Sequence, residues 1–77
     1  MLDYTEFKDE IKNIVNAGDD LFDDDQVDAI AETIRHLDGF SLQNGDSLDS
    51  LDEDVFWDIV RAVDEGKNYD APSDWRA

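Results

Sequence analysis

The sequence predicts an all-α fold, a small three-helix bundle. Three segments carry apolar residues at helical spacing, and each lies between a capping residue and a glycine. The chain has 77 residues, enough for one small domain, and 40% of them are hydrophobic. We therefore expect a single acidic helical domain over residues 1–66 and an extended C-terminal tail over residues 67–77.

The first predicted helix covers residues 4–16. Asp3 can cap its start, and Gly18 follows its end. Its apolar stripe consists of Phe7, Ile11, Ile14 and Val15.

The second predicted helix covers residues 24–37 and has the most complete start signal. Asp23 at the N-cap and Gln26 three residues later form a capping box, and Phe22 and Val27 occupy the positions of a hydrophobic staple. Gly39 follows the helix. The stripe expected to face the core consists of Val27, Ile30, Ala31, Ile34 and Leu37.

Residues 40–49 are less regular. The dipeptide Asn44-Gly45 suits a tight hairpin turn, so this segment is either a short hairpin or an irregular loop.

The third predicted helix covers residues 51–65. Ser50 and Glu53 match a capping box, and Gly66 follows its end. Its apolar face consists of Leu51, Val55, Phe56, Ile59, Ala62 and Val63, with Val60 at the edge. In the tail, Tyr69 and Trp75 can pack back onto the helices.

The charge of the chain is its most unusual property. Six Lys and Arg residues face 22 Asp and Glu residues, a net charge of −16, whereas a small soluble domain carries a net charge of about 2–8 in magnitude. Such a surplus excludes nucleic acids and anionic membranes as direct partners, because both are polyanions. It predicts a partner with a basic surface. The absence of cysteine and of a long apolar run favours a cytoplasmic location.

The acids also follow a pattern. Asp24, Asp28 and Glu32 recur every four residues, as do Asp54 and Asp58. Such neighbours lie about 5–6 Å apart on a helix, so a row of them resembles the repeated charges of a phosphate backbone. We interpret the chain as a nucleic-acid mimic that inhibits a DNA- or RNA-binding protein. The candidate partner-binding residues are Asp19, Asp20, Asp23, Asp24, Asp25, Asp28, Glu32, Asp54, Trp57 and Asp58.

Trp57 falls outside the apolar face of its helix. It is either an interface anchor, a frequent role of tryptophan, or a residue that packs on the tail or on Arg61.

Two other functions fit the same charge. Seventeen of the 22 acids are Asp, a composition that a protein adapted to high salt would also have. The second alternative is an acidic adaptor domain that binds a basic protein without mimicking nucleic acid. A homodimer is compatible with so small a core.

Enzymatic activity is not expected. His36 is the only histidine, no Gly-rich phosphate loop occurs, and neither Asp-rich run has the glycine that an EF-hand loop requires. We therefore predict no catalytic residues, no dedicated metal site and no cofactor.

In charge and expected architecture the chain resembles the small acidic inhibitors of phages and mobile elements, such as anti-CRISPR and anti-restriction proteins. The stretches Asp3-Tyr4-Thr5-Glu6-Phe7 and Trp75-Arg76-Ala77 resemble the immunity proteins of nuclease colicins. The first resemblance implies action in a host cytoplasm, and the second implies a nuclease as the target. The paired tyrosines with which the immunity proteins bind their nuclease have no counterpart here, so no site residue is transferred.

Overall fold

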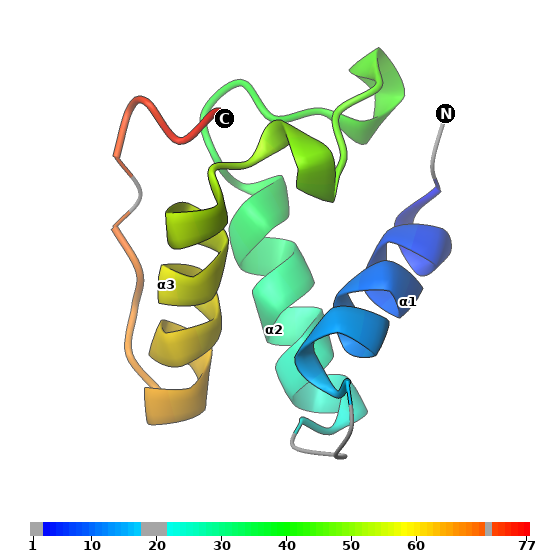
Figure 1. Cartoon of the computed structure of the whole chain (residues 1–77), viewed down its shortest axis with the longest axis vertical. Coiled ribbons are helices and arrows are strands. Elements are labelled where there is room, and N and C mark those ends of the chain that lie inside the picture. Colours follow the sequence, from blue (N-terminus) through cyan, green and yellow to red (C-terminus); the bar gives the residue numbers. More distant parts are fainter. Residues whose placement is uncertain (1–2, 18–21, 71) are drawn as a thin grey trace.

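The second helix lies at the centre of the fold. The computed structural model describes residues 3–17, 22–70 and 72–77. Within these residues the fold contains three α-helices: α1 spans Tyr4–Val15, α2 spans Asp24–Arg35 and α3 spans Glu53–Glu65. Both α1 and α3 pack against α2, while contacts between α1 and α3 are sparse (Figure 1). The predicted three-helix bundle is confirmed.

The core is the contact region of the three apolar stripes. α1 contributes Phe7, Ile11 and Val15, and α2 contributes Val27, Ile30, Ala31 and Ile34. α3 contributes Val55, Phe56, Ile59 and Val60. Four buried residues from outside the helices complete the core: Leu37, Phe40, Leu51 and Trp75.

The starts of α1 and α2 follow the predicted caps. The Asp3 carboxylate accepts a hydrogen bond from the Glu6 amide at 2.8 Å. Asp23 accepts from the Gln26 amide at 2.9 Å, and the Gln26 side chain accepts from the Asp23 amide at 3.2 Å. Both helices end slightly before their predicted limits, because Asn16 and His36 are their C-caps.

Asn16 also fastens the end of α1 to the start of α2. Its carboxamide oxygen accepts from the Phe22 amide at 2.8 Å, and its NH₂ group donates to the Phe22 carbonyl at 3.0 Å. Together the two bonds hold the chain on either side of residues 18–21, which lie outside the described part. Phe22 then packs against the core, as expected for a hydrophobic staple.

Two short 3₁₀-helices replace the hairpin alternative for residues 40–49. They are η1, Leu42–Asn44, and η2, Leu48–Ser50. Asp46 closes the first turn, because its carboxylate accepts from the Ser41 amide at 2.9 Å and its own amide donates to the Ser41 carbonyl at 3.0 Å. Gly45 adopts the left-handed conformation, with φ of 93°, that this closure requires. The hairpin alternative is thus wrong, and the irregular loop is correct.

The start of α3 differs from the prediction. Asp52 is the N-cap and accepts from the Asp54 amide at 2.9 Å, whereas the Ser50 hydroxyl accepts from Ser47 within η2. The predicted box of Ser50 and Glu53 is therefore wrong. The reason is tertiary: the Asp52 amide donates to the Trp75 carbonyl at 2.9 Å, which holds this segment extended.

The C-terminal residues return along α3 and end near the loop that follows α2 (Figure 1). The Trp75 side chain is only 2% exposed, and its indole N–H donates to the Asp38 carbonyl at 2.8 Å. Arg76 donates to both carboxylate oxygens of Asp46, at 2.9 and 3.1 Å. The hydrogen bonds from Arg76, followed by the one from the Ser41 amide, lower the pKa of Asp46 to about 2. Residues 75 and 76 are thereby part of the same folded unit as the helices.

Candidate protein-binding surface

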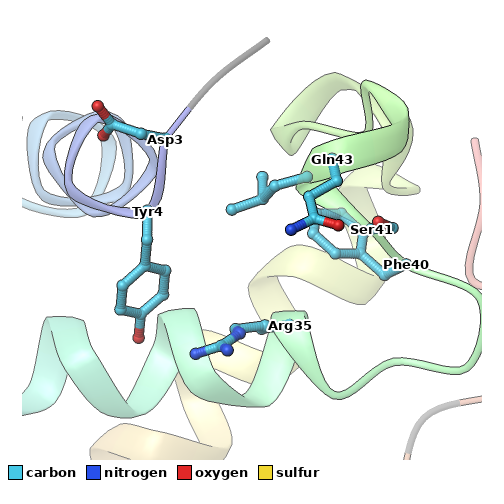
Figure 2. Close-up of a pocket in the computed structure, with 7 residues that line it drawn as sticks. Asp3, Tyr4, Arg35, Phe40, Ser41 and Gln43 are labelled. Atoms are coloured by element: carbon cyan, nitrogen blue, oxygen red, sulfur yellow. The ribbon is translucent and has the colours of Figure 1, made fainter.

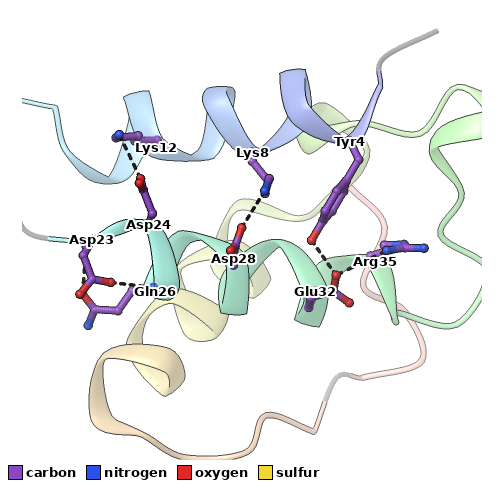
Figure 3. Close-up of polar contacts among 9 residues, drawn as sticks. All are labelled: Tyr4, Lys8, Lys12, Asp23, Asp24, Gln26, Asp28, Glu32 and Arg35. Atoms are coloured by element: carbon purple, nitrogen blue, oxygen red, sulfur yellow. Dashed lines mark hydrogen bonds and ion pairs between the residues drawn. The ribbon is translucent and has the colours of Figure 1, made fainter.

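The predicted acidic row of α2 lies along the seam between α2 and α1 (Figure 3). Each of its three acids contacts one residue of α1: Lys12 Nζ lies 3.2 Å from Asp24 Oδ1, Lys8 Nζ lies 2.8 Å from Asp28 Oδ1, and the Tyr4 hydroxyl donates to Glu32 Oε1 at 2.7 Å. These contacts give the row a structural explanation. It joins α1 to α2, and its charge is partly neutralised there.

The sequence carries a signal for this seam that was not among the predicted features. Residues 4, 8 and 12 of α1 and residues 32, 28 and 24 of α2 both recur every four positions. In an antiparallel helix pair, two such rows can meet side by side. Two lysines and a tyrosine in one row match three carboxylates in the other.

Glu32 has the most polar partners in this row. Besides Tyr4, it contacts Arg35 Nη1 at 3.4 Å and His36 Nε2 at 3.2 Å. The hydrogen bond from Tyr4 is the main cause that lowers the pKa of Glu32. Burial, followed by the same hydrogen bond, raises the pKa of Tyr4 to about 12. His36 thus has an acidic partner on its own helix.

We expect the contribution of Tyr4 to stability to disappear at high pH. Its pKa rises on folding from 10.0 to about 12, so its contribution is complete below pH 10 and is lost as pH approaches 12. The difference in unfolding free energy between wild type and Tyr4→Phe should therefore shrink over this range. Urea unfolding followed by circular dichroism measures it. A difference that stays constant up to pH 12 would show that the hydroxyl does not ionise in this way.

The other acids predicted near the start of α2 are not part of the row that contacts α1. Asp23 is the N-cap, and its carboxylate is engaged there. Asp25 is exposed in the first turn, where the helix dipole favours a negative charge. Asp19 and Asp20 lie outside the described residues.

Most of the basic residues form ion pairs with acids of the same chain. Of the six Lys and Arg residues in the chain, five form ion pairs with acids of the same chain. Arg61 on α3 is exposed and forms no ion pair within residues 3–17, 22–70 and 72–77. Cations therefore neutralise the α1–α2 seam and the tail, and leave little positive charge for other surfaces.

The outward face of α3 carries carboxylates that, unlike those of the α2 row, form no ion pair among the described residues. Its four exposed acids without an ion pair among the described residues are Glu53, Asp54, Asp58 and Asp64. We call them the α3 acidic face. Two of them, Asp54 and Asp58, belong to the predicted set. The other two are not among the predicted partner-binding residues, although their spacing on the helix places them on the same exposed side.

Trp57 lies among these acids and is 42% exposed, so its predicted outward position is correct. Its ring meets Phe56 edge-on, with centroids 5.1 Å apart and planes at 77°. No cation–π contact with Arg61 is found in the described part of the chain. One edge of the Trp57 ring is thus in contact with Phe56, while much of the side chain remains exposed to solvent.

Beside Trp57 lies a shallow hollow of about 330 Å³ between the end of α1 and the start of α3. Its lining consists of Ile14, Leu48, Asp49, Leu51, Glu53, Phe56 and Trp57. We call it the apolar groove. Ile14 is 43% exposed there, so the prediction that it faces the core is wrong. The sparse contacts between α1 and α3 leave this side of Ile14 uncovered.

Two larger hollows are lined by other residues. One, of about 710 Å³, is lined by residues that include Tyr4, Arg35, Ser41 and Gln43 (Figure 2). Its Arg35 guanidinium lies 5.1 Å from the Tyr4 ring centroid and also pairs with Glu32. Because the chain carries a net charge of −16, its overall field repels anions that Arg35 would otherwise attract. The second, of about 760 Å³, lies between the end of α2 and the residues after α3.

Neither a metal-ion cluster nor a membrane-spanning helix occurs among the described residues. No group of three or more His, Asp and Glu side chains in this part of the chain is placed to hold a metal ion. None of the described helices has both the length and the apolar character needed to cross a membrane.

Comparison of the chain with protein-family models, with curated protein sequences and with solved structures finds no match in any of the three.

Proposed function

We propose that this protein is an acidic inhibitor that mimics nucleic acid and occupies the basic surface of a DNA- or RNA-binding protein. It acts by binding in the cytoplasm and carries out no chemistry itself. The observation that carries the proposal is the division of charge. The cations lie mainly at intramolecular contacts, whereas the α3 acidic face presents carboxylates without ion pairs among the described residues.

The charge density of α3 supports the comparison with a nucleic acid. Residues 53–64 cover about 17 Å of helix axis, at about 1.5 Å per residue. The α3 acidic face places four carboxylates along this length. One DNA strand carries about five phosphates over the same distance, at about 3.4 Å each. Arg61 reduces the net charge of the face by one.

The rigidity of the α3 acidic face also favours recognition. Its helix is capped by Asp52 at the start and by Gly66 at the end, and its inner side is anchored in the core by Val55, Phe56, Ile59 and Val60. A helix backbone that is already ordered loses little conformational freedom on binding, and the charges that it carries steer a basic partner during approach. The α2 row provides less of this attraction, because α1 pairs with it.

Affinity capture tests the proposal. The purified chain is immobilised and exposed to a cell extract at low salt, and the captured proteins are identified by mass spectrometry. We expect nucleic-acid-binding proteins that are released by duplex DNA or by moderate salt. Captured proteins that DNA does not displace would indicate an adaptor instead. Failure to capture any protein, together with folding only at high salt, would indicate a halophilic domain.

A further inference from the structure

We propose that the apolar groove receives the apolar side chains of a basic amphipathic segment of the partner. This inference rests on the proposed function and names the chemistry of the segment that is bound. Charge attracts such a segment to α3, and the groove then selects one with apolar residues over one that is only basic.

The walls of the groove are unusual for this fold. Ile14 and Trp57 are the most exposed large hydrophobic residues in the described part of the chain, and both line the same hollow. They come from α1 and α3, which share few contacts with each other. Isolated exposed apolar residues are common, but these two line the same hollow. Leu48, Leu51 and Phe56 provide its remaining apolar lining.

The floor of the apolar groove is formed by buried core residues. Phe56 and Leu51 are buried, at 7% and 5% exposure, so the floor is part of the rigid core. The Trp57 ring packs edge-on against Phe56 at the border of this floor. A volume of about 330 Å³ lies at the low end of the roughly 300–1,000 Å³ typical of small-molecule sites. It suits a few side chains of a larger partner.

Two acidic residues at the edge of the apolar groove favour a basic partner. Asp49 and Glu53 line the groove, and both are exposed without an ion pair among residues 3–17, 22–70 and 72–77. Lys or Arg residues that flank an apolar anchor would pair with them. A second copy of this chain would instead bring another net charge of −16 against the same edge. Electrostatic repulsion therefore disfavours self-association at the groove.

Two synthetic peptides of equal charge test the inference. The first is a Lys-rich amphipathic helix with Leu along one face, and the second has Ser in place of each Leu. Fluorescence anisotropy of labelled peptides gives their affinities at physiological salt. We expect the amphipathic peptide to bind wild type about tenfold more tightly or better. Equal affinities of the two peptides would overturn the proposal.

Variants of the groove locate the preference. Trp57→Ala should weaken binding of the amphipathic peptide about 10–30-fold and leave the Ser peptide unchanged. Ile14→Ser should act in the same direction, and it tests the groove independently of the tryptophan. Asp64→Asn is the matched control, since it should lower both affinities equally. A preference for the amphipathic peptide that survives both groove variants would contradict the proposal.

Sedimentation equilibrium tests the competing occupant. We expect wild type and Trp57→Ala both to be monomeric. A wild-type dimer that Trp57→Ala abolishes would assign the groove to a second copy and overturn the inference. The peptide preference does not depend on displacement by DNA. Failure of the groove and failure of nucleic-acid mimicry are therefore distinguishable.

Discussion

Replacement of Trp75 by alanine is expected to destabilise the fold by about 3–5 kcal/mol, the typical cost of truncating a buried aromatic residue to alanine. Trp75 is the largest fully buried side chain among the described residues and packs on Phe40 at a centroid distance of 5.7 Å. Its loss also leaves the Asp38 carbonyl without the indole donor. A chain of 77 residues has a total stability of about 4–12 kcal/mol, so this single change removes a large part of it.

Urea unfolding followed by circular dichroism measures the effect, and Trp57→Ala is the matched control. Trp57 is 42% exposed, so its replacement should cost about 1 kcal/mol or less. Equal losses for the two tryptophans would contradict the burial of Trp75. It would also mean that the C-terminal residues are not anchored as described.

Neutralisation of α3 is expected to have the largest effect on binding. Glu53→Gln, Asp54→Asn and Asp58→Asn together should weaken binding to a captured partner by roughly 10–100-fold at low salt and reduce its salt dependence. These substitutions keep the size of the side chains. The repulsion that they remove along the helix offsets part of the favourable dipole interaction that Glu53 and Asp54 lose in the first turn, so α3 should remain folded. Surface plasmon resonance at several salt concentrations gives both quantities.

The matched control removes the same number of charges from α2. Asp24→Asn, Asp28→Asn and Glu32→Gln remove the negative charges that pair with Lys12 and Lys8 and that strengthen the hydrogen bond from Tyr4. We expect this set to lower stability and to reduce binding much less than the α3 set does. If the α2 set abolishes binding while the α3 set leaves it intact, the partner-binding surface is the α2 row.

Local signals in the sequence predicted the helices well. The capping box of Asp23 and Gln26 acts within four residues, so its outcome depends little on the rest of the chain. The start of α3 could not be predicted in this way. It depends on the hydrogen bond between Asp52 and the carbonyl of Trp75, which is distant in sequence.

The candidate site shows the same difference between local and tertiary information. The outward position of Trp57 follows from the periodicity of its own helix, and it was predicted. The exposure of Ile14 depends on where α1 and α3 lie relative to each other, and periodicity contains no such information. Likewise, the α2 row could be recognised from spacing, but its pairing required the position of α1.

Competition between this chain and duplex DNA for one captured nucleic-acid-binding protein tests mimicry most directly. We predict that the two ligands exclude each other. The apparent Kd for the chain should then rise in proportion to DNA concentration, and no complex should contain all three components. A ternary complex, or an apparent Kd that DNA leaves unchanged, would contradict mimicry and place the chain on another surface of its partner.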